Sequence, residues 1–206
     1  MTGDRAGHLF DDLIERPVLR DQFQYGLPVL FQSFGLAGGL DPALAAGALL
    51  APRAVLSQGR RIACDVGLRS RLSGEGIPCL LAGDAVVASA AEKRRLWRET
   101  GAGAVDLESG GVAEVATAAG LPFAVLRAVC DPAGRDLPRA ATEALDEQGR
   151  IAPLRMAAIL VRDPRQILDL VALGRDVARA RRALVGGAES LGRLAAGHPD
   201  LRALSL

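Results

Sequence analysis

The sequence predicts an α/β fold with strands buried in a parallel sheet, and two neighbouring patterns carry that prediction. Pro122 to Val129 is a nearly all-apolar run, which is typical of a strand covered on both faces. The residues before it, from about Gly110 to Ala119, have the pattern of a helix. Gly120 suits the C-terminal cap of that helix, because glycine reaches the left-handed conformation without steric cost. With 206 residues the chain is long enough to bury a sizeable core in one domain.

The N-terminal part divides at about residue 27. Residues 1–27 form a divergent segment, either an amphipathic helix interrupted near Pro17 or a leader that packs poorly. The main domain is expected to cover residues 28–206. It opens with a short strand, Val29 to Phe31, that runs into a predicted turn containing Gly35, Gly38 and Gly39. A glycine-rich turn lets the backbone approach a ligand closely, and a plain tight turn is the alternative.

The next elements alternate between strand and helix. Ala48 to Leu56, broken by Pro52, predicts a strand, and a helix follows from about Cys64 to Leu72. Ile77 to Leu81 predicts another strand. A helix over residues 90–100 then begins at Ser89, which can cap it together with Glu92 three positions later.

The C-terminal third is predicted to be helical. A loop lies between Pro132 and Pro138, short helices extend to Val161, and Asp163-Pro164 opens a long helix that Gly186-Gly187 should weaken. Five residues of this helix form one apolar face: Leu170, Leu173, Val177, Ala180 and Leu184. Three share a basic face that contacts either solvent or anionic lipid headgroups: Arg175, Arg179 and Arg182.

Composition narrows the possible functions. A net charge of +1 argues against nucleic acid as a partner. The three cysteines, Cys64, Cys79 and Cys130, form no CxxC pair and no even set, which favours a reduced, cytoplasmic setting. The two histidines, His8 and His198, lie near the termini, so a His-dependent triad or a His-rich metal centre is not expected. Acid–base chemistry must then come from carboxylates.

Carboxylates follow two predicted strands. Glu108 comes just after a short strand that begins near Gly103, and Asp131 ends the apolar strand. Ligands of parallel sheets bind outside the carboxyl ends of the strands, so we expect both side chains to face one crevice from neighbouring strands. In the alternative interpretation, Asp131 caps a turn and Glu108 is an acid at a helix N-terminus.

Four motifs at compatible spacing resemble a known family: SFGLAGGLDPAL, GDAVVASAAEKRRL, GAVDLESGGVAEVA and GLPFAVLRAVCDPAGRDLP. In this order they resemble the nucleoside phosphorylase superfamily and, within it, the methylthioadenosine/adenosylhomocysteine nucleosidases. They are most similar to hopanoid-associated phosphorylases, which are adenosylhopane nucleosidases. The resemblance extends over about residues 30–184.

The resemblance implies a three-layer α/β/α fold with a central mixed sheet. It implies cleavage of the N-glycosidic bond of an adenosyl compound, most closely adenosylhopane, with release of adenine. The acceptor is water or inorganic phosphate, and no cofactor or metal is implied. The implied partners are a small purine nucleoside, a membrane that holds a lipid substrate, and further copies of the chain.

The family pattern also assigns roles to single residues. Asp131, preceded by Cys130 where the family usually has serine, would donate a proton to N7 of the leaving purine. Leu107 and Glu108 would hold the ribose. The ribose and nucleophile side maps to Gly35, Leu36, Ala37, Gly38 and Gly39. The base side maps to Gly83, Asp84, Ala85, Val86 and Val87.

The chemistry agrees with these roles, because cleavage places positive charge on the ribose and negative charge on the departing base. An acid at the base is worth about 10²–10⁴-fold in rate. To donate at neutral pH, Asp131 needs a pKa raised by burial.

The chain departs from the family pattern at three places. No strand with a Gly-rich turn and a glutamate is recognisable before Leu30, so this N-terminal βα unit is lost or divergent. Leu36 stands where a serine is common, and Val86 replaces a stacking aromatic. The alternative function is therefore a catalytically impaired protein that binds a purine nucleoside or a partner.

Overall fold

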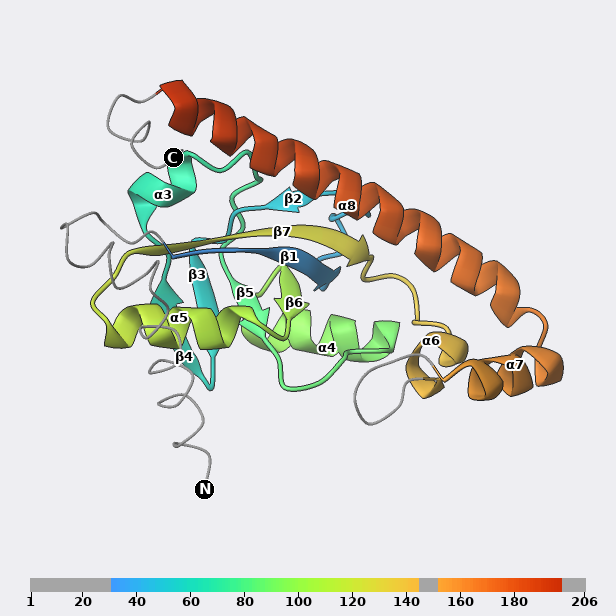
Figure 1. The fold of residues 1–206 in the computed structure, drawn as a ribbon. Coiled ribbons are helices and arrows are strands. Elements are labelled where there is room, and N and C mark those ends of the chain that lie inside the picture. The colour runs from blue at the N-terminus through green and yellow to red at the C-terminus, as the bar shows by residue number, and fades with distance from the viewer. Residues whose placement is uncertain (1–30, 145–151, 198–206) are drawn as a thin grey trace.

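The computed structural model describes residues 31–144 and 152–197 as a mixed α/β fold in three layers (Figure 1). A seven-stranded sheet lies between helix α8 on one face and helix α5 on the other. The prediction of a three-layer fold with a mixed sheet is confirmed. The predicted N-terminal segment, the first residues of the strand expected from Val29, and both histidines lie outside the described residues.

The strands are β1 (Phe31–Gly39), β2 (Leu49–Leu50), β3 (Ala54–Ser57), β4 (Arg60–Ala63), β5 (Leu80–Ala82), β6 (Ala104–Asp106) and β7 (Phe123–Asp131). The helices are α3 (Val66–Ser70), α4 (Ala90–Thr100), α5 (Ser109–Ala118), α6 (Arg139–Glu143), α7 (Pro153–Arg162) and α8 (Gln166–Gly197).

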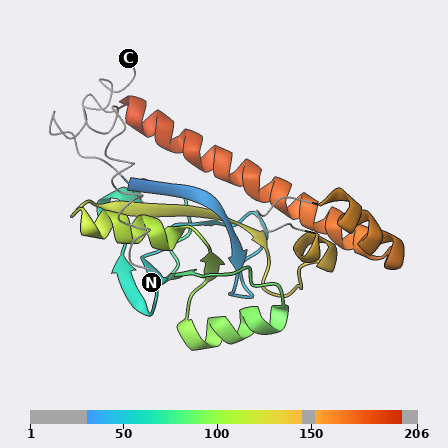
Figure 2. The same ribbon diagram turned by 60° about the horizontal axis from the view of Figure 1, so that its bottom comes forward.

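Strands β7 and β1 form the centre of the sheet, whose order is β2-β7-β1-β6-β5-β3-β4. They run parallel from Phe31 opposite Phe123 to Gly38 opposite Asp131. Toward its C-terminal end β1 bends, as Figure 2 shows, and its last two residues pair with β6 in the antiparallel sense. This bend brings the ends of β6 and β7 to either side of Gly38.

The predicted helix and apolar strand around Gly120 are confirmed. Gly120 has φ 65°, and the N–H of Leu121 donates to the carbonyl of Ala116, which closes the C-terminus of α5 as a Schellman motif. Strand β7 is buried at every residue except the half-buried Cys130, and it extends through Asp131. Asp131 is therefore the last residue of the strand, and the core positions its carboxyl side chain.

The predicted turn at Gly35, Gly38 and Gly39 is wrong, because all three glycines lie within β1. A Cβ added at Gly35 would lie 3.1 Å from Nη1 of Arg127, and one at Gly39 would lie 3.3 Å from Cγ1 of Val129. Glycine is therefore needed here for close packing inside a strand, not for a turn.

Three other boundaries differ from the prediction. Residues 48–56 form two strands, because the chain on either side of Pro52 joins different parts of the sheet: β2 pairs with β7 and β3 pairs with β5. The hairpin from β3 to β4 was not predicted; its turn places Gln58 at φ 47° and Gly59 at φ 76°, as a two-residue hairpin loop requires. Strand β5 begins at Leu80, and α3 covers only the middle of its predicted range, after Asp65 at the N-cap.

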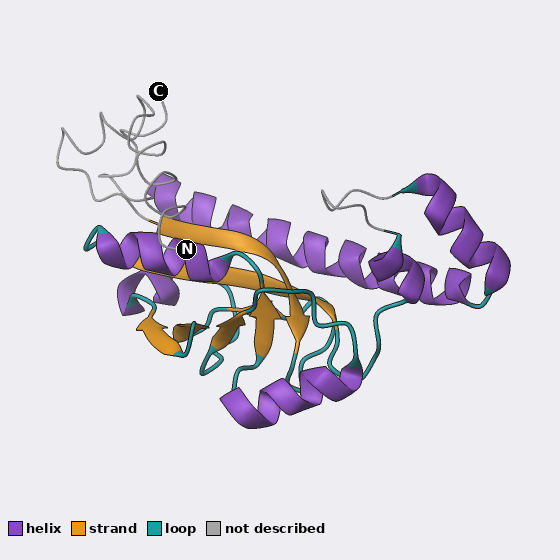
Figure 3. Ribbon diagram, turned by 90° about the horizontal axis from the view of Figure 1, so that it is seen from below, coloured by secondary structure: helices purple, strands orange, loops and turns teal. Residues whose placement is uncertain are grey.

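Helix α4 begins as predicted, since the Ser89 hydroxyl accepts a hydrogen bond of 3.1 Å from the N–H of Glu92. Helix α8 packs its predicted apolar face on β7 and spans the length of the molecule, with α6 and α7 at one end (Figure 3). Helix α8 continues through Gly186-Gly187, and Gly187 lies directly against the core: an added Cβ would be 3.2 Å from the side chains of Leu126 and Leu49. None of the described helices is long and apolar enough to cross a bilayer.

Candidate functional site

A cavity of about 480 Å³ lies where β1, β6 and β7 end. Eight of the predicted site residues line it: Leu36, Ala37, Gly38, Val86, Val87, Leu107, Glu108 and Asp131. Ala85 and Cys130 line it as well. Four other residues of the family motifs, Gly35, Gly39, Gly83 and Asp84, are not part of its wall. Val105 and Asp106 of β6 complete the strand side of the wall, and the rest comes from the C-terminal helices and the loop before α6, through Leu137, Ala141, Thr142, Leu173 and Val177.

The two carboxylates share this cavity but do not lie on neighbouring strands, so that part of the prediction is wrong. Strand β1 separates β6 from β7. Gly38 pairs with Val105 on one side and with Asp131 on the other. Glu108 and Asp131 therefore approach the cavity from opposite sides of one glycine-containing strand end.

Asp131 is a buried carboxyl group with one occupied oxygen. Its side chain belongs to the last residue of β7, and the residue is 5% exposed. Oδ2 lies 2.5 Å from Nζ of Lys93, whereas the buried Oδ1 has no hydrogen-bond partner among the described residues. Burial raises the pKa of Asp131, and the Lys93 ammonium opposes this rise. The direction is the one that a proton donor at neutral pH requires.

Lys93 was not found by sequence reasoning, because it lies in the charged run EKRR of a helix that suggested solvent exposure. It is nevertheless fully buried. Besides Asp131, its ammonium donates to the carbonyls of Pro132, at 3.2 Å, and Arg135, at 2.8 Å. One signal in the sequence could have indicated it: Lys93 is the only lysine among 25 lysine and arginine residues.

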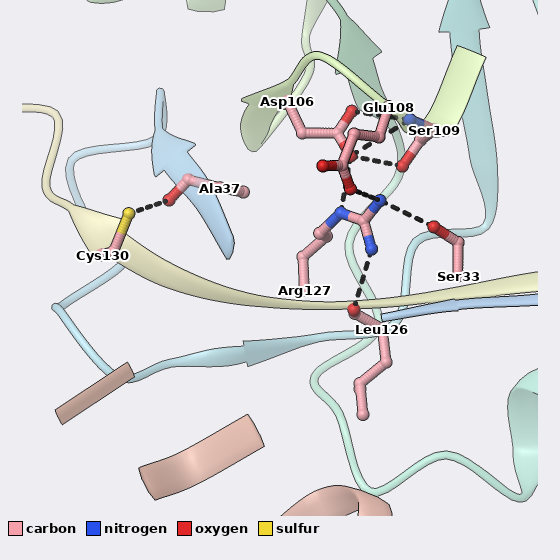
Figure 4. Close-up of polar contacts among 8 residues, drawn as sticks. All are labelled: Ser33, Ala37, Asp106, Glu108, Ser109, Leu126, Arg127 and Cys130. Carbon is pink, nitrogen blue, oxygen red and sulfur yellow. Dashed lines mark hydrogen bonds and ion pairs between the residues drawn. The ribbon is translucent and has the colours of Figure 1, made fainter. Parts of the chain in front are cut away.

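Arg127 of β7 forms a second buried ion pair, which reaches across β1 to Asp106 of β6 (Figure 4). It lies in the middle of β7, fully buried, with Nε 2.5 Å from Oδ2 of Asp106. Its Nη2 donates to the Ser33 hydroxyl at 2.8 Å. The Ser109 hydroxyl also donates to Oδ2 of Asp106 at 2.5 Å, and the Ser109 N–H donates to Oδ1 at 3.3 Å. The apolar appearance of β7 concealed this cluster from sequence reasoning.

Glu108 is the exposed carboxylate of the site. It occupies the N-cap position of α5, but its side chain makes no capping hydrogen bond. The side chain is 75% exposed, and its Oε2 lies 3.7 Å from Nη2 of Arg127. Glu108 is therefore accessible to a ligand in the cavity, with a buried guanidinium behind it.

Burial raises the pKa of all three cysteine thiols, of which Cys64 and Cys79 are buried and Cys130 is half-buried. Cys130 donates through Sγ to the carbonyl of Ala37 at 3.5 Å, and burial together with the neighbouring Asp131 raises the pKa of its thiol. Burial also raises the pKa of Cys79, and that of Cys64 to about 12. Across residues 31–144 and 152–197, no group of three or more His, Cys, Asp or Glu side chains is arranged to hold a metal ion.

Solved structures similar to this chain include a hydrolase mutant and a nucleosidase. A futalosine hydrolase mutant of Helicobacter pylori aligns with 24% identity and a TM-score of 0.48, over 56% of this chain and 62% of that one. A 5′-methylthioadenosine/S-adenosyl homocysteine nucleosidase of Campylobacter jejuni aligns with 22% identity and a TM-score of 0.48, over 56% of this chain and 61% of that one. The chain thus spans about three fifths of the length of each.

Comparison at the level of sequence matches only part of the chain. No curated protein matches the chain. Residues 79–162, which include Lys93, Glu108 and Asp131, match the family model described as the phosphorylase superfamily.

Proposed function

We propose that this protein cleaves the N-glycosidic bond of a purine nucleoside. The observation that carries the proposal is Asp131: a buried carboxyl with a raised pKa and one unpaired oxygen, on the wall of a mostly apolar cavity. The match of residues 79–162 to the phosphorylase superfamily model supports it.

The proposed mechanism uses the two carboxylates differently. Asp131 gives its proton to the departing purine, so that the base leaves as a neutral molecule. Glu108 accepts hydrogen bonds from the ribose hydroxyls and stabilises the positive charge that develops on the sugar. The nucleophile is water or inorganic phosphate.

The proposed substrate is an adenosyl compound with a hydrocarbon substituent, adenosylhopane, and the cavity wall supports this proposal. Leu137 and the α8 residues Leu173 and Val177 add apolar side chains to the cavity wall. Helix α7, which contacts α6, exposes Leu154 and Val161 to solvent. We propose that these exposed side chains, with the basic face of α8, contact the membrane in which such a substrate is dissolved.

Adenine release tests the proposal. The full chain is incubated with adenosylhopane or methylthioadenosine, with and without phosphate, and free adenine is measured. We expect release from at least one substrate and none from Asp131→Asn. Phosphate dependence would identify phosphorolysis.

Binding of either nucleoside by the folded protein without release of adenine would overturn the enzymatic proposal. It would favour the alternative function, a nucleoside-binding protein. Circular dichroism of each preparation shows whether the protein assayed is folded.

A further inference from the structure

We propose that Lys93 is a positioning residue for the acid: it holds Oδ2 of Asp131, reserves Oδ1 for the substrate, and stabilises the carboxylate that forms as the proton leaves. This inference rests on the proposed function of Asp131 as the proton donor. It assigns a role to a residue that lies on a different element, α4, and that does not itself line the cavity.

The geometry leaves the Lys93 ammonium no freedom. Its three donors match three acceptors: Oδ2 of Asp131 at 2.5 Å and the carbonyls of Pro132 and Arg135. All three acceptors belong to the end of β7 and the loop that follows it. The carboxyl group is thereby fixed through one oxygen, and the other oxygen is left as the hydrogen-bonding atom.

The same loop is tied to residues that directly follow the segment expected to face the base. Oδ1 of Asp136 accepts a hydrogen bond of 2.6 Å from the N–H of Ala90, and the N–H of Leu137 donates to the carbonyl of Ala88 at 2.7 Å. Lys93 extends from the first turn of α4, just after these residues. It therefore joins the acid and the base-side wall into one unit.

The choice of lysine at this position has a physical reason. The other 24 basic residues of the chain are arginines, obtained as 25 Lys and Arg minus this one lysine. A guanidinium is planar and wide, with five donors in a fixed fork, whereas an ammonium is a compact point charge. A fully buried site with three acceptors converging on one atom fits the ammonium.

The charges make proton donation favourable. Before transfer, a neutral Asp131 lies beside a buried ammonium that has no counterion. The proton then moves from Asp131 to the leaving nitrogen of the purine, Lys93 keeps its own proton, and an ion pair remains. The other charged groups that act on Asp131 are Arg135, which favours the carboxylate, and Asp176 of α8, which opposes it. Arg135 and Asp176 form an ion pair with each other, so Lys93 is the cation dedicated to Asp131.

The first test compares Lys93→Met, which keeps the length but not the charge, with Lys93→Arg, which keeps the charge. For Lys93→Met we expect adenine release to fall about tenfold. The alkaline limb of the pH–rate profile should move to higher pH, because the pKa of Asp131 rises when the ammonium beside it is lost. In Lys93→Arg the alkaline limb should lie close to its position in the original protein, whereas the rate of adenine release should recover less. An unchanged rate and an unchanged limb in folded Lys93→Met would overturn the proposal.

The second test needs no substitution at Lys93 and no activity. Because the chain has one lysine, lysine labelled with ¹³C at Cε gives a single side-chain NMR signal in the full-length protein. We expect this signal to move with pH as Asp131 titrates and to lose that step in Asp131→Asn, whereas Asp169→Asn, a surface control on α8, should retain it. A signal that titrates identically in both variants overturns the proposal.

The two readouts separate the possible failures. Coupling of Lys93 to Asp131 in a protein that binds nucleosides but releases no adenine would overturn the proposed function. It would also overturn the positioning role of Lys93, and the ion pair of Lys93 with Asp131 would then have only a structural role. Adenine release without the coupling would overturn only the role of Lys93.

Discussion

Two buried ion pairs each include a residue of β7 next to the central strand β1, and they differ in one respect. In the pair of Arg127 with Asp106, both carboxylate oxygens accept hydrogen bonds, from Arg127 and from Ser109. In the pair of Lys93 with Asp131, one oxygen is bonded and the other is buried without a partner among the described residues. The first pair is complete within the protein, whereas the second lacks a hydrogen-bond partner that a ligand can supply.

The difference indicates which pair serves the fold and which serves a site. A buried polar atom without a partner costs about 1–3 kcal/mol, so folding alone would not favour leaving Oδ1 of Asp131 open. A complete network, by contrast, makes the core rigid and specific. Glu108 connects the two regions, since it is exposed at the cavity and lies 3.7 Å from Arg127.

The largest effect is expected for Asp131→Asn. The amide cannot supply a proton, so we expect adenine release to fall by about 10²–10⁴-fold. Steady-state kinetics measures the loss, and Asp169→Asn on the exposed surface of α8 is the control. Near-normal turnover in Asp131→Asn would show that Asp131 is not the proton donor.

Arg127→Met tests the complete pair, and its effect should appear in stability. The substitution leaves Asp106 buried without its cation, which costs about 3–5 kcal/mol of the free energy of unfolding. Urea denaturation measures the loss, and the exposed Arg94→Met is the matched control. If Arg127→Met unfolded at the same urea concentration as the original protein, the structural role of this pair would be wrong.

Glu108→Gln tests the residue between the two pairs. The side chain is 75% exposed, so the free energy of unfolding should change little. Hydrogen bonds to a charged group contribute about 1.5–3 kcal/mol, and their loss should lower kcat/KM by about ten- to a hundredfold. Kinetics compared with Glu99→Gln on α4 checks this, and equal kcat/KM values for the two variants would exclude Glu108 from sugar binding.

The smallest effect is expected for Ser33→Ala. It removes the hydroxyl that accepts from Nη2 of Arg127, while the contact between Arg127 and Asp106 remains. We expect a loss of about 1 kcal/mol in the free energy of unfolding, without a change in adenine release. A large kinetic effect in a stable Ser33→Ala protein would mean that the complete pair also contributes to turnover.

Local patterns in the sequence determined much of the architecture around the site. Three predictions are confirmed: the apolar strand β7, the C-terminal cap of α5 at Gly120 and the N-cap of α4 at Ser89. Each depends only on residues close to it in the sequence. The sequence also placed Asp131 and Glu108 on one cavity, but for a different reason from the one expected: the bend of β1, which pairs with β7 in the parallel and with β6 in the antiparallel sense, brings the two strand ends together.

Contacts between distant segments decided the rest. The bend of β1 separates β6 from β7, and the glycines of β1 serve packing against Arg127 and Val129 instead of a turn. Contacts between distant segments also decide the burial of Lys93 and its pairing with Asp131, which is 38 positions away in the sequence. The sequence near Lys93 or Arg127 does not indicate which carboxylate each will pair with. The pairing depends on how the sheet brings its strand ends together. The sequence by itself determined the strand β7, the helices on either side of the site and the two carboxylates, because these depend on local patterns. The tertiary structure decided which carboxyl oxygen is left for a ligand, because that depends on contacts between distant segments.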